Sequence, residues 1–212
     1  MLKFGLVCEG VTDHATIENI LCGFYNNKSL KSEIQAFQPL FDATQQKQQD
    51  GEFGGWEELM RHLSTKRFRE SVINTEYMII QIDTDISEHP NFNVSQRDLS
   101  SEELIEKVIV RLIEEIDSKK EFYSKYQQKI IFAISVHSLE CWILPIYRNF
   151  KKEKISGCFE ALKRESKEIK VAKNYGKYNE LTQDFLKHKK LIEIAKKNFS
   201  LKQFLNRLPN EL

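Results

Sequence analysis

The sequence predicts an α/β protein with a doubly wound, mainly parallel sheet, helices on both faces of that sheet, and a helical appendage at the C-terminal end. Three observations predict this class. Apolar runs recur at residues 3–8, 77–82 and 129–136, and helical spacing of apolar residues recurs between them. The runs show little alternation, which is typical of strands buried on both faces. Strands that alternate with helices form parallel sheets.

The first apolar run, residues 3–8, is the expected first strand. The stretch after it has apolar residues at helical spacing, and either Thr12 or Asp13 is expected to cap this helix. A second strand is expected at residues 33–38, where Pro39 ends it.

The middle of the chain continues the alternation. Residues 42–55 are polar and rich in glutamine, which predicts a long surface loop. Residues 56–68 have helical periodicity and predict one helix. Residues 77–82 then form the third expected strand, and it runs directly into an Asp-Thr-Asp sequence.

A third helix and a fourth strand complete the expected sheet. Ser100 and Glu103 form a possible capping box for a helix over residues 101–117. Residues 129–136 are the fourth strand, and the helix after it is expected to stop or kink at Pro145.

A change in composition divides the chain. We expect an α/β core over residues 1–150 and a lysine-rich helical extension over residues 151–212 that packs on the core. The extension lacks a strong strand pattern. Its expected short helices cover residues 157–165, 178–185, 189–197 and 200–208.

Composition excludes several classes of protein. The formal net charge is +1, so no overall basic field indicates a polyanion partner. No apolar run approaches the roughly 18 residues of a membrane-spanning helix, and the N-terminal stretch lacks the pattern of a signal peptide. The chain also lacks a phosphate-binding glycine loop and a dinucleotide-binding fingerprint, so ATP hydrolysis has no local support.

The four cysteines contain no C-x-x-C pair, which makes a zinc ribbon unlikely on spacing grounds. Without an export signal, we expect a cytoplasmic protein whose Cys8, Cys22, Cys141 and Cys158 are reduced, buried thiols.

Acidic residues follow three of the expected strands. Glu9 and Asp13 follow the first, Asp83 and Asp85 the third, and Glu140 the fourth. Each group has an ordinary explanation by itself, as helix-end charges or as loop residues in Asx turns. Parallel strands deliver their carboxyl ends to one edge, so the groups together favour a shared site. Clustered carboxylates repel one another, and Mg²⁺ or Mn²⁺ is the cation that best compensates them.

Two acidic motifs in this sequence resemble those of a known domain family. A strand ending in Glu9-Gly10-x-x-Asp13, followed by a strand ending in Asp83-x-Asp85, resembles the Toprim domain, which has a Rossmann-like sheet. The resemblance covers roughly residues 1–147. Ser138-x-Glu140 after the fourth strand is similar to the element found in OLD-type Toprim nucleases. The C-terminal stretch at residues 198–208, NFSLKQFLNRL, resembles small stand-alone Toprim proteins found near phage-defence genes.

The resemblance implies a division of roles among these residues. Glu9, Asp83 and Asp85 would hold one metal ion and act in catalysis, and Asp13, Ser138 and Glu140 would serve a second ion. OLD-type enzymes also place a lysine near the scissile phosphate. The candidates for it, which would also contact nucleic acid, are Lys173 and Lys177. A separate basic stretch that could bind nucleic acid consists of Lys66, Arg67 and Arg69.

The function implied is a nuclease that depends on Mg²⁺ or Mn²⁺ and hydrolyses phosphodiesters with one or two metals, with DNA favoured over RNA as substrate. The ATPase portion of OLD-type proteins is absent from this sequence, so any ATPase would be a separate partner chain. The alternative is a non-catalytic Toprim-like module that binds or regulates a partner such as an ATPase. No membrane partner is expected.

Overall fold

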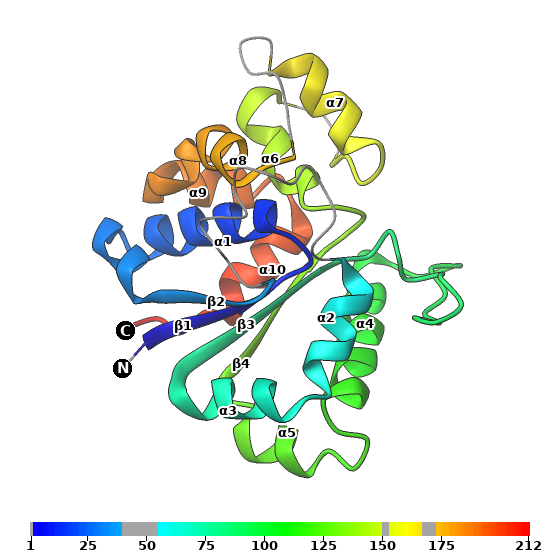
Figure 1. The fold of residues 1–212 in the computed structure, drawn as a ribbon. Coiled ribbons are helices and arrows are strands. Elements are labelled where there is room, and N and C mark those ends of the chain that lie inside the picture. Colours follow the sequence, from blue (N-terminus) through cyan, green and yellow to red (C-terminus); the bar gives the residue numbers. More distant parts are fainter. Residues whose placement is uncertain (1, 40–54, 150–152, 167–172) are drawn as a thin grey trace.

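The computed structural model describes residues 2–39, 55–149, 153–166 and 173–212. Within them the strands form one sheet in the order β2-β1-β3-β4, and every neighbouring pair is parallel (Figure 1). The strands are β1 (Leu2–Val7), β2 (Ile34–Gln38), β3 (Thr75–Asp83) and β4 (Ile130–Ser135). The chain is therefore an α/β protein with a doubly wound parallel sheet, as predicted.

Helices cover both faces of the sheet, because strands of a parallel sheet are apolar on both sides. One face carries α2 (Trp56–Leu63), α3 (Lys66–Asn74), α4 (Ser101–Ile116) and α5 (Glu121–Tyr126). The other face carries α1 (Val11–Phe24), η1 (Lys28–Glu33), α6 (Glu140–Tyr147), α7 (Cys158–Glu165), α8 (Tyr175–Leu181), η3 (Gln183–Leu186), α9 (His188–Ala195) and α10 (Phe199–Arg207). Each face has its own buried hydrophobic cluster.

The strand order reverses between β1 and β3. β2 lies on one side of β1, whereas β3 and β4 lie on the other. In open α/β sheets the helices on either side of such a reversal diverge, so ligands bind beyond the carboxyl ends of these two strands. A ligand site is therefore expected among the residues that follow β1 and β3.

Several predicted elements are confirmed, and two predicted helices are wrong. The helix expected over residues 178–185 is instead α8, which begins at Tyr175 and ends at Leu181, followed by the separate 3-10 turn η3. The capping box of α4 is present, since the Ser100 hydroxyl accepts from the Glu103 N–H at 3.2 Å and the Glu103 carboxylate accepts from the Ser100 N–H at 2.8 Å. The single helix expected over residues 56–68 is instead two helices, α2 and α3. Thr65 separates them, because its side chain accepts from the N–H of Phe68 and starts a new helix.

The expectation of four reduced thiols is also wrong. Cys141 in α6 and Cys158 at the start of α7 form a disulfide, because these two helices pack together and bring their Cα atoms to 5.1 Å. Cys8 and Cys22 are free and buried, as predicted. The loop expected over residues 42–55 lies, apart from Gly55, outside the described residues.

The C-terminal helices share one hydrophobic cluster with α1 and α6. Tyr178, Phe185 and Phe204 are all fully buried in it. In the described part of the chain, the helices are too short or too polar to cross a membrane.

Gly23 permits the closest approach between α1 and the C-terminal segment. A Cβ atom at this position would lie 1.7 Å from the backbone oxygen of Phe185. A backbone carbonyl cannot rotate away as a flexible side chain can, so the two segments would have to separate.

We predict that Gly23→Ala lowers the free energy of unfolding by about 1 to 3 kcal/mol, because overpacking outweighs the better helix propensity of alanine. Urea unfolding followed by circular dichroism measures the change. Gly176→Ala in α8 is the matched control, because the nearest atom to a Cβ at this position would be the Asn174 side-chain oxygen, at 3.6 Å. Equal stability of the two variants would contradict the prediction.

Candidate functional site

Glu9 joins the ends of the two central strands. It follows β1, and its Oε1 accepts a hydrogen bond from the backbone N–H of Asp83 at 2.6 Å. Its own backbone oxygen accepts from the N–H of Gly55 at 2.7 Å, just before α2. The carboxylate of Glu9 therefore lies at the point where the strand order reverses.

Asp13 lies in the first turn of α1 and is buried. The predicted cap is wrong: Gly10 occupies the N-cap position, and Asp13 Oδ2 accepts from the Gly10 N–H at 2.7 Å. This bond stabilises a tight turn from β1 into α1, since it satisfies an N–H that the helix cannot. The turn brings the Asp13 carboxylate close enough to Glu9 for the two charges to interact.

Asp83 is the last residue of β3, and Asp85 follows it in an exposed position. Gln81, fully buried two residues before Asp83 on the same face of the strand, donates from Nε2 to Asp83 Oδ1 at 2.9 Å. The other side-chain atom of this amide, Oε1, is buried without a hydrogen-bond partner. Gln81 therefore orients Asp83.

The segment after β4 lies against the segment after β3. The Thr84 hydroxyl accepts from the His137 N–H at 2.7 Å, and the Asp85 N–H donates to the His137 carbonyl at 3.0 Å. Ser138 and Glu140 follow and are buried. These bonds bring the third acidic segment to the same edge as the other two.

Burial and repulsion between charges raise the pKa values of Glu9, Asp13, Asp83 and Asp85. Burial raises the pKa of Glu9 to about 8, and the Asp13 charge adds to the rise. Burial raises the pKa of Asp13 to about 7, with Glu140 contributing in the same direction. The pKa of Asp83 lies well above its ordinary value because of burial and of Glu9. Asp85 is more exposed, and its pKa is raised by partial burial of its carboxyl group and by Glu140. Shifts of this kind mark candidate functional sites.

The two candidate lysines differ in their surroundings. Lys173 opposes these shifts, since its positive charge lowers the pKa of Glu9, Asp13 and Asp85. Its ammonium group lies 4.8 Å from the ring centroid of Phe159 in α7. Lys177 instead pairs with Glu180 at 2.7 Å.

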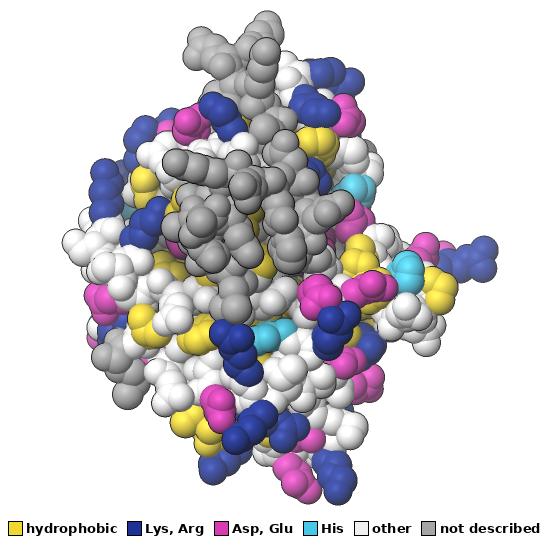
Figure 2. Space-filling model, in the orientation of Figure 1, with side chains coloured by type: hydrophobic (Ala, Val, Ile, Leu, Met, Phe, Trp, Pro, Cys, Tyr) yellow, Lys and Arg dark blue, Asp and Glu magenta, His cyan; other side chains and the backbone are white. Residues whose placement is uncertain are grey.

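Lys66, Arg67 and Arg69 are not brought to this site. They are exposed on α3, which leads into the opposite end of β3. Lys66 pairs with Glu70, and the Arg69 guanidinium lies over the Phe122 ring. On the face drawn in Figure 2, Lys and Arg side chains alternate with Asp and Glu outside the grey atoms.

The donor set has the chemistry of a site for a hard divalent cation. Carboxylate oxygens predominate, their charges repel one another, and the Ser138 hydroxyl is buried without a hydrogen-bond partner. Among the residues that the structure describes, however, no three His, Cys, Asp or Glu side chains are placed together as metal ligands. Binding of a cation would therefore require side chains to turn from their present positions.

Sequence reasoning missed Gln81 and Tyr178. Gln81 could have been found, because a glutamine inside an otherwise apolar strand must find a partner when buried. Tyr178 donates its hydroxyl hydrogen to Glu140 Oε1 from α8, which lies 38 residues further along the chain. No local signal in the sequence predicts that contact.

No protein-family model, curated protein or solved structure matches this chain. The resemblance to Toprim domains therefore stays a prediction that depends on the motif residues themselves.

We predict that the metal-free protein loses stability as the pH rises from about 4.5 toward about 8. Folding raises the pKa of Glu9, so over this range the folded state holds a proton that the unfolded chain has released, and the free energy of unfolding falls with increasing pH. Asp13, Asp83 and Asp85 contribute in the same direction, so Glu9→Gln should reduce this loss and raise the free energy of unfolding near the upper limit by on the order of 1 to 3 kcal/mol.

Urea unfolding in a chelator, at both ends of this pH range, measures the effect. Glu211→Gln is the control, because that side chain is exposed at the C-terminal end. A Glu9→Gln variant whose free energy of unfolding differs from that of wild type by the same amount at both pH values would contradict the prediction.

Proposed function

We propose that this protein is a Toprim-like nuclease of the OLD type that hydrolyses nucleic-acid phosphodiesters with Mg²⁺ or Mn²⁺. The observation that carries the proposal is the convergence of three acidic segments, after β1, β3 and β4, beyond the point where the strand order reverses. Burial and the neighbouring carboxylates raise the pKa values of Glu9, Asp13 and Asp83 in these segments.

Electrostatics support a cationic ligand over a neutral one. A buried cluster of carboxylates is stable only if it keeps protons or gains positive charge. Here the pKa of Glu9 is raised to about 8 and that of Asp13 to about 7, so near neutral pH these groups are protonated or in equilibrium with protons. A divalent cation would displace those protons.

Under this proposal, Glu9, Asp83 and Asp85 would hold one cation, and Asp13, Ser138 and Glu140 would serve a second. When bound, such ions stabilise the charge that develops on the phosphate and lower the pKa of an attacking water. Gln81 would hold Asp83 in place, through the hydrogen bond at 2.9 Å. Lys173, whose positive charge lowers the pKa values of Glu9 and Asp85, would contact the phosphate.

DNA is the favoured substrate, and the proposed setting is phage defence with a separate ATPase chain. The visible surface offers no single block of positive charge outside the grey atoms (Figure 2). Under this proposal, Lys173 and the ions would bind the nucleic acid at the site.

The second candidate function is a non-catalytic Toprim-like module that acts with a partner protein. One observation favours it: within the described ranges, no three candidate ligands already stand together as a metal site. Titration with Mn²⁺ by calorimetry separates the two functions, because only the nuclease requires the ion.

We predict that the protein cleaves plasmid DNA in Mn²⁺ or Mg²⁺, and that a chelator abolishes cleavage. Glu9→Ala and Asp83→Ala should each lower the rate by on the order of 100-fold or more, since each removes a carboxylate that would hold the cation at the reacting phosphate. Gel electrophoresis of the products, with RNA as a second substrate, provides the measurement.

The matched control is Glu76→Ala. Glu76 lies at the opposite end of β3 from Asp83 and pairs with Lys3 at 2.8 Å. Its loss should leave cleavage unchanged. Cleavage that persists in a chelator, or in both site variants, would rule out the proposed site.

A further inference from the structure

Helix α8 of the C-terminal extension contacts the acidic residues beyond the carboxyl ends of the strands through one side chain. We call these residues, Glu9, Asp13, Asp83, Asp85 and Glu140, the acidic edge. Tyr178 is fully buried, and its hydroxyl donates to Glu140 Oε1. Burial and the charge of Glu140 hold the pKa of Tyr178 above its usual range, and Asp13 and Asp83 act in the same direction. The phenol therefore keeps its proton and serves as a donor toward the acidic segments.

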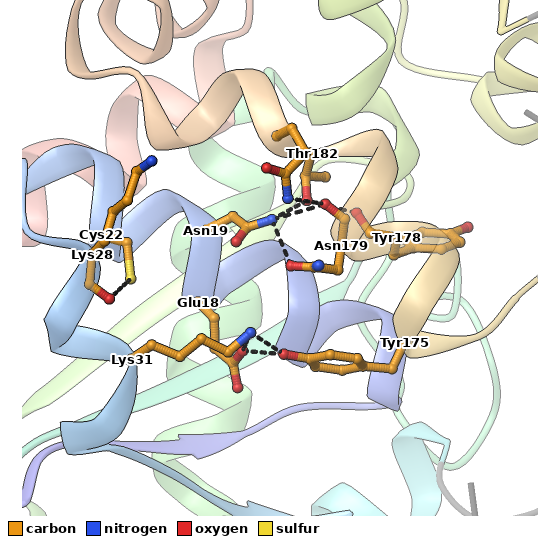
Figure 3. A network of polar contacts seen from close by, with 10 residues as sticks. Glu18, Asn19, Cys22, Lys28, Lys31, Tyr175, Tyr178, Asn179 and Thr182 are labelled. Atoms are coloured by element: carbon orange, nitrogen blue, oxygen red, sulfur yellow. Dashed lines mark hydrogen bonds and ion pairs between the residues drawn. The ribbon is translucent and has the colours of Figure 1, made fainter. Parts of the chain in front are cut away.

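Polar contacts with α1 hold α8 on both sides of Tyr178 (Figure 3). Asn19 of α1 donates to the Thr182 hydroxyl at 2.8 Å and to the Asn179 carbonyl at 3.2 Å. One turn earlier, the Tyr175 hydroxyl donates to Glu18 of α1 at 2.5 Å. The helix that carries Tyr178 is thus attached to the helix that carries Asp13.

A third contact attaches α8 to α6. The Tyr147 hydroxyl, at the end of α6, donates to the backbone oxygen of Leu181 at 2.8 Å. Glu140 lies at the start of the same helix. Both ends of α6 are therefore bonded to α8, and α8 in turn is bonded to α1.

A buried carboxylate with one oxygen bonded to a fixed donor has lost most of its freedom to rotate. Partners of this kind, which contact a ligand group and not the ion, orient that group and typically contribute 10- to 100-fold to metal affinity. Tyr178 meets these requirements, since it is fully buried and its helix is hydrogen-bonded to α1 on both sides of it.

We propose that Tyr178 is a positioning residue for Glu140, and that through it the C-terminal extension completes the metal site. This inference rests on the proposed function. Tyr178 would not contact the ion or the substrate. It would hold Glu140 Oε1, so that the remaining oxygen of Glu140 faces the cation in one orientation.

The test is the affinity of the full chain for Mn²⁺, measured by calorimetry without nucleic acid. Tyr178→Phe should raise the dissociation constant by about 10-fold or more, because the phenol donor is lost while the ring remains. Tyr25→Phe is the matched control: it removes a tyrosine hydroxyl that donates to the backbone oxygen of Pro209, at the opposite end of α1 from Asp13 and outside the contacts that hold α8. Its affinity for Mn²⁺ should equal that of wild type.

A double-mutant cycle separates positioning from a general loss of stability. Glu140→Ala should weaken Mn²⁺ binding, and Tyr178→Phe should weaken it no further in that background. An equal, additive loss with and without Glu140, or a Tyr178→Phe variant that binds as wild type does, would overturn the inference.

Two further outcomes keep the result interpretable. If Tyr178→Phe does not fold, Asn19→Ala tests the same arrangement, because it loosens α8 without touching Tyr178 and should also weaken Mn²⁺ binding; unchanged affinity would overturn the inference. If wild type itself binds no Mn²⁺, the proposed function fails and this inference with it. That result differs from failure of the inference alone, in which wild type binds the ion and Tyr178→Phe binds it equally well.

Discussion

The parallel pairing of β1 with β3 is the interaction on which the rest of this structure depends. It places Val7 opposite Ile80, so both strands end at the same edge. Because the strand order reverses here, the chain leaves β1 toward one face and enters β3 from the other. The Glu9 carboxylate bridges the two strand ends through the Asp83 N–H. The sheet and the candidate site are therefore set by the same pairing.

Burial of the neighbouring carboxylates of the acidic edge is electrostatically unfavourable. Neutral side chains at these positions would not repel one another, and proteins rarely bury several carboxylates without compensation. The protein offsets part of the conflict with backbone N–H donors at Gly10 and Asp83, with Gln81, and with the charge of Lys173. The raised pKa values of Glu9 and Asp13 show that this compensation is incomplete. Incomplete compensation is expected where a ligand supplies the remainder.

The C-terminal helices both cover the sheet and contribute a side chain to the candidate site. They share a hydrophobic cluster with α1 and α6, and Gly23 lets the chain at Phe185 approach α1 closely. The Asn19 contacts then set the position of α8. In consequence a tyrosine from the end of the chain contacts an acid from the end of β4. The disulfide between Cys141 and Cys158 joins the same group of helices.

The sequence alone determined the parallel α/β class, the four strands and the acidic residues that follow three of them. Each of these follows from a pattern of residues within a short stretch of sequence, such as an apolar run or the apolar spacing of a helix. It could not determine that the helix expected over residues 56–68 breaks at Thr65, or that Gly10 caps α1, since those outcomes depend on single hydrogen bonds. It also could not reveal Tyr178 beside Glu140, the separate surroundings of Lys173 and Lys177, or the disulfide. These contacts join residues from different helices, so only the packing of those helices on the sheet decides them.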